Sequence, residues 1–323
     1  MMTKNRLLIL LLAMLFATGS KMEAHQNPLI CDMEKGVCGA DSTSEQENNI
    51  KNNTDKPVRI IYFTDPICSS CWGIEAQLRK LKLEYGNVIE IEYRMGGLLP
   101  DWSFRRGDGI NSPRDVAKHW DKASKYYDMP IDGDVWLENP LASSYPPSVA
   151  YKAAEMQGKE KATKFMRRMR EMLFLEKKNI TMWSIMTEAA KESGLDIDQF
   201  DHDYEYHAQK LFQEDLALKN QLEVTGFPTM IMINKDGEEE VIRGSKPYVV
   251  YEGAVVGLFE QAEKKDYPKD LDSLLEIYPT LTAKEYSVLS EKDRVAAEEE
   301  LKELVSEGEL NKTETKNGNL YYK

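Results

Sequence analysis

The hydrophobic positions over residues 58–95 follow three successive patterns: a nearly continuous run, a helical spacing and an alternation with polar positions. Residues 58–63 are rich in β-branched and aromatic side chains, and residues 88–95 alternate apolar with polar positions, so both stretches predict strands. Between them, Ile74, Leu78, Leu81 and Tyr85 recur at helical spacing before Gly86, which predicts a helix that ends there. The order predicts a strand, a crossover helix and a second strand.

The stretch from about residue 100 to 220 has no strand pattern and predicts a helical insertion. The expected helices cover residues 114–127, 147–157, 160–175, 181–193 and 199–220. After the insertion, residues 230–234 and 240–243 flank a Lys-Asp-Gly turn and predict a hairpin. Residues 247–264 then place Tyr248, Tyr251 and Val255 on one helical face. We therefore expect an α/β domain over residues 57–266.

The last stretch, residues 267–323, has a pattern of its own. Thr282 and Glu285 form a capping-box sequence, a charged helix is expected over residues 291–307, and strands are expected on both sides of Asn317-Gly318. This order predicts a small winged-helix-like module. Twelve acidic and seven basic residues from Leu271 onward argue against DNA binding by it, so packing or partner contact is the expected role.

The first 24 residues have the pattern of a secretory signal peptide. A short basic start is followed by an apolar run over residues 7–17 and by small residues at 17–20. The apolar run is short for a membrane span, so we expect no stable membrane insertion after processing and a periplasmic or secreted protein. Residues 25–56 are then expected to form a cysteine-containing segment and a flexible linker.

Charge and length narrow the class of protein. The 323 residues carry 55 acidic and 42 basic side chains, a net charge of −13, which argues against nucleic acid as a partner. A chain of this length with 41% hydrophobic residues can bury a full core.

Cys68 and Cys71 stand at the expected start of the helix that follows the first strand. Thiols three positions apart on a first helical turn can close a disulfide, and the helix N-terminus stabilises a thiolate at the first of them. Cys68 is therefore the expected attacking thiol and Cys71 the resolving one. The alternatives are half of a zinc site or two buried structural cysteines. No metal and no cofactor are expected.

Two further cysteines, Cys31 and Cys38, precede the first strand. They could close a local disulfide, exchange with Cys68 and Cys71 as a secondary redox pair, or share a zinc site with them. The four histidines are scattered along the sequence and do not support the zinc alternative.

Two motifs carry a resemblance to a known family. The sequence Cys-Ser-Ser-Cys-Trp-Gly over residues 68–73 and Gly-Phe-Pro-Thr over residues 226–229 resemble the DsbA-like branch of the thioredoxin superfamily, closest to FrnE-type dithiol-disulfide oxidoreductases. The resemblance implies a thioredoxin-like fold with a helical insertion and a cis bond between Phe227 and Pro228 beside the thiols. It also implies that the neighbouring backbone pairs with a substrate chain, with Trp72, Phe227 and Pro228 as substrate-binding residues.

The resemblance implies a thiol-disulfide oxidoreductase that acts on protein thiols or disulfides and is recycled by a redox partner. A non-catalytic adaptor of the same fold that presents partner proteins for proteolysis is the alternative, and it would make the protein cytoplasmic. A glutathione-dependent isomerase is a third class, against which Cys71 counts.

The motif departs from DsbA proteins, which usually carry Pro-His between the cysteines. Ser69 and Ser70 provide no cation, so the helix N-terminus is expected to stabilise the thiolate. Asp65 and Glu75 are candidate proton-relay carboxylates, with capping by Asp65 and a surface position for Glu75 as alternatives.

Overall fold

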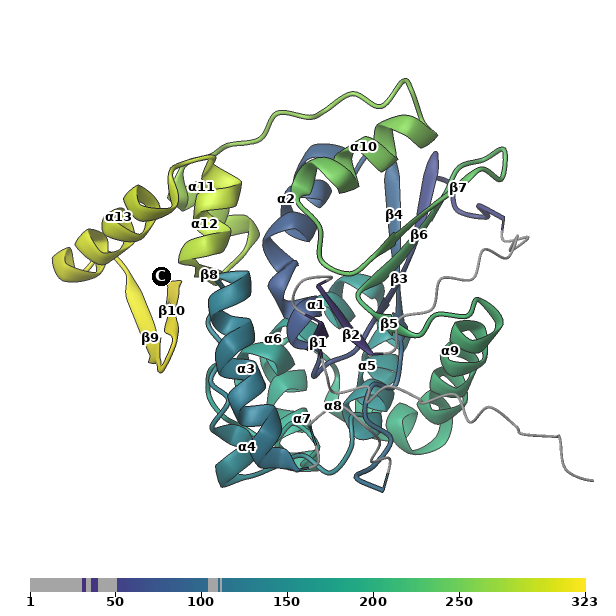
Figure 1. Ribbon diagram of the computed structural model, residues 1–323, viewed down its shortest axis with the longest axis horizontal. Helices are drawn as coiled ribbons and strands as arrows, with labels where there is room; N and C mark the ends of the chain where they lie inside the picture. The colour runs from purple at the N-terminus through teal and green to yellow at the C-terminus, as the bar shows by residue number, and fades with distance from the viewer. Residues whose placement is uncertain (1–30, 33–35, 40–50, 104–109, 111) are drawn as a thin grey trace, which may run out of the picture.

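The computed structural model describes residues 31–32, 36–39, 51–103, 110 and 112–323 of the chain (Figure 1). The expected signal peptide lies outside the described residues. Among the described residues, no helix is long and apolar enough to cross a membrane.

A four-stranded sheet forms the centre of the main domain, in the order β4-β3-β6-β7. Strand β3 (Val58–Thr64) pairs in parallel with β4 (Ile89–Met95) and antiparallel with β6 (Thr229–Ile233), which continues to β7 (Glu239–Arg243). Every residue of β3 is buried, which explains why that strand reads as one apolar run without alternation. The predicted strand, helix and strand unit and the later hairpin are confirmed.

The motif helix is broken where the sequence predicts one continuous helix. Helix α1 (Ser69–Gly73) ends at Ile74, and α2 (Glu75–Tyr85) begins there. Helix α10 (Tyr248–Leu258) packs against α2, β6 and β7. The short helix α1 therefore carries only the motif, at the end of the central strand β3.

The predicted helical insertion is confirmed and contains seven α-helices and one π-helical turn among the described residues. They are α3 (Pro113–Tyr127), α4 (Val135–Glu138), α5 (Tyr145–Met156), α6 (Lys159–Phe174), α7 (Trp183–Glu192), α8 (Ile197–Asp203), η1 (Tyr204–Ala208) and α9 (Gln209–Gln221). The predicted helix over residues 199–220 is confirmed as a continuous helical run, in which the unpredicted π-helical turn η1 lies between α8 and α9. The Met and aromatic side chains of α6 lie in the core, as expected.

A second, small sheet joins the N-terminal segment to the main domain. Strand β1 (Cys31–Asp32) pairs with β2 (Val37–Gly39), and β2 pairs with β5 (Gly226–Phe227), both antiparallel. No strand before residue 58 is predicted from the sequence. We refer to β1 and β2 together as the cysteine hairpin.

The C-terminal module has its own hydrophobic core, as its separate sequence pattern predicts. It consists of α11 (Leu271–Ile277), β8 (Leu281–Thr282), α12 (Ala283–Ser290), α13 (Arg294–Glu307), β9 (Asn311–Thr315) and β10 (Gly318–Tyr322), with strand order β8-β10-β9. Thr282 and Glu285 form the predicted capping box. Figure 1 shows the module beside α2 and α3, away from β7.

Candidate functional site

The two motif cysteines lie at the start of α1 and are both fully buried as free thiols. Cys68 is the N-cap residue, and its Sγ accepts a hydrogen bond from the backbone N–H of Cys71 over 3.2 Å. That N–H is one of the first-turn donors that a helix leaves without an internal partner, so the motif places a sulfur where an N-cap acceptor normally lies.

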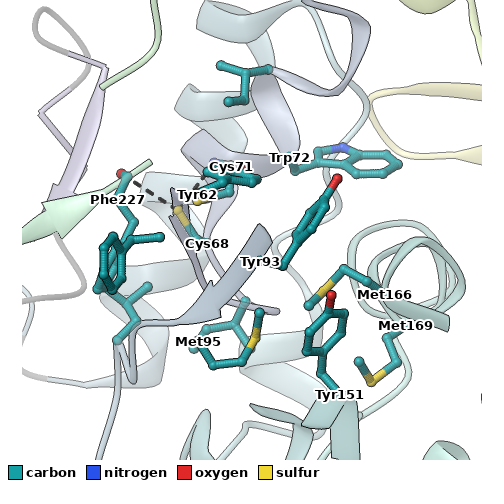
Figure 2. Close-up of a cluster of buried hydrophobic side chains, with 14 of the residues drawn as sticks. Tyr62, Cys68, Cys71, Trp72, Tyr93, Met95, Tyr151, Met166, Met169 and Phe227 are labelled. Carbon is teal, nitrogen blue, oxygen red and sulfur yellow. Dashed lines mark hydrogen bonds between the residues drawn. The ribbon is translucent and has the colours of Figure 1, made fainter. Parts of the chain in front are cut away.

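Phe227 and Pro228 lie beside Cys68, as the resemblance implies. The bond between them is cis, and the Cys68 thiol donates a weak hydrogen bond to the Phe227 carbonyl over 3.8 Å (Figure 2). A Cβ added at Gly96 would lie 2.0 Å from the Phe227 ring, so a glycine is needed there to admit that ring. The structure thus brings together Cys68, Cys71, Phe227 and Pro228 from distant parts of the sequence.

Trp72, predicted to bind substrate, lies in the core. Its side chain is fully buried, its Nε1–H donates to the Pro130 carbonyl over 3.0 Å, and its ring stacks on Phe174. Figure 2 shows the indole pointing away from Phe227. The prediction is wrong in this structure because the Trp72 side chain faces the helical layer, not the β5 edge.

Burial and hydrogen bonding set the acidities of the two thiols in opposite directions. Burial raises the pKa of Cys68, and the neighbouring Cys71 thiol adds to this effect. Burial also opposes ionisation of Cys71, but the hydrogen bond from Cys68 together with Arg170 and Thr64 lowers the pKa of Cys71. With the site closed as it is here, the resolving cysteine of the motif is the more acidic thiol.

Arg170 supplies a cation beside the motif, which the two serines between the cysteines do not provide. It reaches the motif from α6, is fully buried, and its Nη2 donates to Thr64 Oγ1 over 2.7 Å and to the Asp65 carbonyl over 3.3 Å. Its Nη1 forms an ion pair with Glu75 over 2.5 Å. The surface alternative for Glu75 is therefore wrong, because Glu75 is the partly buried counter-ion of a buried arginine, and proton relay by Glu75 stays a prediction.

Asp65 holds the loops around the motif together. Its carboxylate accepts hydrogen bonds from the backbone N–H groups of Ile67 (3.0 Å) and Leu98 (2.7 Å) and from the Ser144 hydroxyl (2.9 Å). Burial raises the pKa of Asp65 to about 6, with these three hydrogen bonds partly opposing the shift. The capping alternative for Asp65 is wrong, because Cys68 is the N-cap residue of α1, and proton relay stays a prediction.

The backbone edge next to Pro228, expected to be free for a substrate chain, is paired with the protein's own cysteine hairpin. Cys38 is the register partner of Phe227, and Gly39 is the partner of Gly226. The three pairings considered for Cys31 and Cys38 concern side chains outside the described part of the structure, and all three stay predictions.

Comparison with known proteins places the site in a family. A family model described as Thioredoxin matches residues 62–253. A protein from Halalkalibacterium halodurans named ClpXP adapter protein SpxH is 35% identical over 305 residues, which cover 93% of this chain and 99% of that protein. The protein of the same name from Bacillus subtilis is 31% identical over 268 residues, covering 81% of this chain and 88% of the relative. The chain belongs to the thioredoxin-like family that contains these SpxH proteins.

Solved structures add the fold of this family's core. A protein from Nitrosomonas europaea, provisionally titled a protein disulfide isomerase, superimposes with a TM-score of 0.54 at 16% identity. It covers 64% of this chain and 97% of its own length. The thioredoxin-like, DsbA-type fold is thus confirmed, whereas the relatives named above are SpxH proteins, so the FrnE-type assignment stays a prediction.

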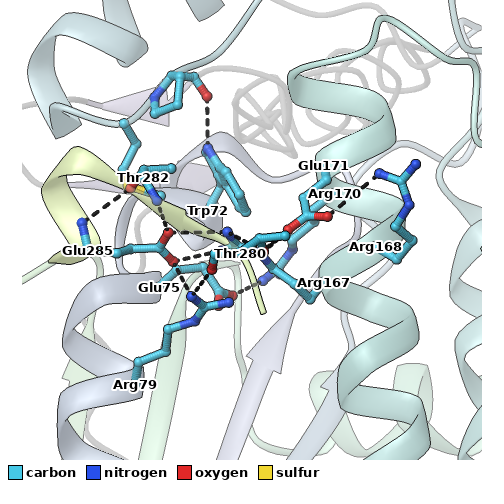
Figure 3. A network of polar contacts seen from close by, with 12 residues as sticks. Trp72, Glu75, Arg79, Arg167, Arg168, Arg170, Glu171, Thr280, Thr282 and Glu285 are labelled. Atoms are coloured by element: carbon cyan, nitrogen blue, oxygen red, sulfur yellow. Dashed lines mark hydrogen bonds and ion pairs between the residues drawn. The ribbon is translucent and has the colours of Figure 1, made fainter. Parts of the chain in front are cut away.

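In this SpxH-like chain the C-terminal module is joined to the site by buried ion pairs. Arg167 of α6 forms a two-bond contact with the Glu285 carboxylate over 2.6 and 3.1 Å, and Arg79 of α2 lies 3.2 Å from the same carboxylate (Figure 3). The Arg167 guanidinium also lies over the Trp72 ring, 4.5 Å from its centroid. The module therefore packs on the helices that hold the motif.

One group of side chains among the described residues has the composition of a metal site. Ligand atoms of His202, Asp203 and His207 lie within 4.8 Å of one another. The π-helical turn η1 changes the spacing and brings the two histidines together, which corrects the expectation that the histidines are scattered. Both histidines are exposed, and the group is on α8 and η1, apart from the motif.

Proposed function

We propose that the protein is an adaptor that presents partner proteins to a ClpXP-type protease. The observation that carries the proposal is similarity along nearly the whole chain to a protein named as such an adaptor, with 93% of this chain and 99% of the relative aligned. The unaligned remainder is much shorter than the C-terminal module, so part of the module must belong to the shared region.

An adaptor is also supported by how much of the chain each comparison covers, the solved structure on one side and the SpxH relative on the other. The disulfide isomerase-like structure covers 64% of this chain, which leaves about a third without a counterpart in it. The SpxH similarity extends into that third. Protein surface beyond the thioredoxin-like core is what an adaptor needs to hold two partners at once.

The state of the thiols fits a protein that does not depend on them for its main role. Both are fully buried, the pKa of Cys68 is raised by burial, and the adjacent backbone edge is occupied. A thiol acts as a nucleophile through its thiolate, so Cys68 in this closed state is a poor one. An adaptor would work in this state without any opening of the site.

Dithiol-disulfide exchange is the second candidate, and the lowered pKa of Cys71 beside Arg170 favours it. If the cysteine hairpin leaves β5, Cys68 gains access to water and its burial penalty falls. Cys68 and Cys71 could then exchange with a protein disulfide, with a separate redox partner to restore them.

The two candidates differ in where the protein would act. An adaptor would work inside the cell beside its protease, whereas the signal-peptide pattern of residues 1–24 predicts export. N-terminal sequencing of the protein isolated from its host tests this difference. Retention of residues 1–24 would support the adaptor, and cleavage near residue 20 would contradict it.

The function itself is tested by pulse-chase proteomics in a host that lacks the protein. An adaptor predicts that a small set of proteins gains a longer half-life, and that the double variant Cys68→Ser with Cys71→Ser restores rapid turnover as well as the parent does. Restoration by the parent alone would overturn the thiol-independent adaptor and favour exchange. Unchanged half-lives throughout would overturn the adaptor outright.

A further inference from the structure

The cysteine hairpin lies in the position that a substrate strand would take at this site. Strand β2 pairs antiparallel with β5, the two residues that immediately precede Pro228. Cα atoms of β2 also lie within 8 Å of Cα atoms of α1, the helix that carries Cys71. The hairpin thus approaches both elements that form the thiol site.

The strand register places position 38 opposite the residue whose carbonyl contacts the attacking thiol of the motif. Cys38 is the register partner of Phe227, and the Phe227 carbonyl lies 3.8 Å from Cys68 Sγ. Directly opposite residues on antiparallel strands have Cα atoms about 4.5 to 5.5 Å apart. Position 38 is therefore one interstrand spacing away from the residue that contacts Cys68.

The same register pairs the two hairpin cysteines with each other. Cys31 and Cys38 are direct partners between β1 and β2. The Cα separation of opposite residues in an antiparallel ladder, about 4.5 to 5.5 Å, falls within the range of about 4.4 to 6.8 Å in which disulfides form. The hairpin can therefore carry either two thiols or one disulfide without a change of backbone pairing.

A tight turn holds the hairpin in this place. The Gly36 carbonyl accepts a hydrogen bond from the Ser245 N–H over 2.7 Å, and Gly36 has a φ of +66°. A Cβ at Gly36 would lie 2.7 Å from both N and Cβ of Ser245. Only glycine combines this backbone conformation with this close approach, so the docked position is specified by the sequence.

From these placements we propose that Cys31 and Cys38 are a built-in redox partner of Cys68 and Cys71, with Cys38 and Cys68 as the exchanging sulfurs. When the motif holds the Cys68–Cys71 disulfide, the Cys38 thiolate attacks Cys68 Sγ, a Cys38–Cys68 bond forms, and Cys71 leaves as a thiolate. The Cys31 thiolate then attacks Cys38 Sγ, a Cys31–Cys38 bond forms, and Cys68 leaves as a thiolate.

The exchange balances within the one chain. Two electrons pass from the hairpin dithiol to the motif disulfide, the two protons given up by Cys31 and Cys38 are matched by the two taken up at Cys68 and Cys71, and no further oxidant is needed. The same steps in reverse move the disulfide back to the motif. The proposal goes beyond delivery of proteins to a protease and does not depend on it.

Two double variants of the full-length chain test the register directly. Cys31→Ser with Cys71→Ser leaves Cys38 and Cys68, whereas Cys38→Ser with Cys71→Ser leaves Cys31 and Cys68. Each purified protein is equilibrated in a glutathione redox buffer, alkylated and digested without reduction, and the linked peptides are quantified by mass spectrometry. We expect at least tenfold more Cys38–Cys68 than Cys31–Cys68 linkage.

Equal yields in the two variants, or a larger yield of Cys31–Cys68, would overturn the proposal. Matching thermal transitions of the two variants establish that both are folded, so absence of a Cys38–Cys68 link in the folded protein would also overturn it. Zinc bound at one equivalent per chain in the parent and lost in Cys38→Ser would assign these cysteines to metal binding and contradict the redox role.

Discussion

The two additions to the thioredoxin-like core are held to it in different ways. The cysteine hairpin docks through backbone pairing of β2 with two residues of β5 and through the close approach at Gly36. The C-terminal module docks through the buried carboxylate of Glu285, which is held by Arg79 and Arg167. Short backbone pairing is a contact that another strand can replace, whereas a buried ion pair is costly to break.

The difference suggests a division of roles. The hairpin pairs with β5 beside the thiols, so we expect that it can give way to a strand of a partner or exchange its own cysteines. The module is a permanent part of the surface, since its separation would break the buried ion pairs of Glu285 with Arg79 and Arg167. Variants of each region should therefore affect different properties of the protein.

The largest expected effect is at the module. Glu285→Ala should lower the free energy of unfolding by about 3 to 5 kcal/mol, because it removes the buried carboxylate that pairs with Arg79 and Arg167, of which Arg167 keeps only Glu171 as an ion-pair partner among the described residues. The matched control, Glu298→Ala, removes a partly exposed carboxylate that pairs with Arg294 and Lys302 and should cost at most about 1 kcal/mol. Urea unfolding measures both, and equal losses would contradict the permanent docking of the module.

The next effect gives the thiol site and the module opposite pH dependences of stability. The raised pKa of Asp65, about 6 against 3.8, means that the folded state binds this proton more tightly than the unfolded state. Stability from Asp65 is therefore present below about pH 4 and is lost as the pH rises through 6, by about 3 kcal/mol in total. Burial opposes ionisation of Glu285, but Arg167 and Arg79 lower the pKa of its carboxyl group. The stability that Glu285 contributes is therefore present above the ordinary glutamate pKa and is lost as the pH falls.

Unfolding curves between about pH 3 and 7 test these opposite signs. The stability of the parent relative to Asp65→Asn should fall as the pH rises, and the stability relative to Glu285→Gln should rise. A constant difference for Asp65→Asn would show that its carboxyl group ionises with an ordinary pKa in the folded protein.

The smallest expected effect on stability is at the hairpin. Gly36→Ala should cost about 1 to 2 kcal/mol locally, because a residue with a Cβ is strained at positive φ and meets Ser245. Release of β2 from β5 should then speed alkylation of Cys68 about tenfold or more. Gly194→Ala is the control, since Gly194 also has a positive φ of +74° but has nothing within 4 Å of an added Cβ.

The rates are measured by iodoacetamide labelling and mass spectrometry under native conditions. Faster labelling in Gly36→Ala than in Gly194→Ala would support a cysteine hairpin that can be displaced from β5. Equal rates would show that the hairpin does not limit access to Cys68.

Much of the core could be predicted because its signals are local. The buried β3 run, the hairpin after Pro228 and the capping box at Thr282 each follow from a few adjacent residues, and the motif of Cys68 and Cys71 identified the site. The break at Ile74 and the π-helical turn η1 were missed because they alter the spacing without altering the hydrophobic pattern.

The missed features of the site depend on pairings between distant residues. Arg170 lies among the apolar positions of α6, next to Met169, and this charged residue on a buried face was the one signal that could have revealed it. Nothing in the sequence of Val37–Gly39 indicates that such a short strand pairs with residues 226–227. Trp72 was misassigned because its position in the motif does not specify which side of α1 it faces.

Reconstituted degradation is the most direct test of whether the protein delivers partners for proteolysis. The proteins that gain longer half-lives in the host lacking this chain are purified and incubated with ClpX, ClpP and ATP, with and without the full-length chain. We expect the chain to speed their degradation at least tenfold, and we expect the double variant Cys68→Ser with Cys71→Ser to do so equally. Degradation at the same rate with and without the chain would contradict it.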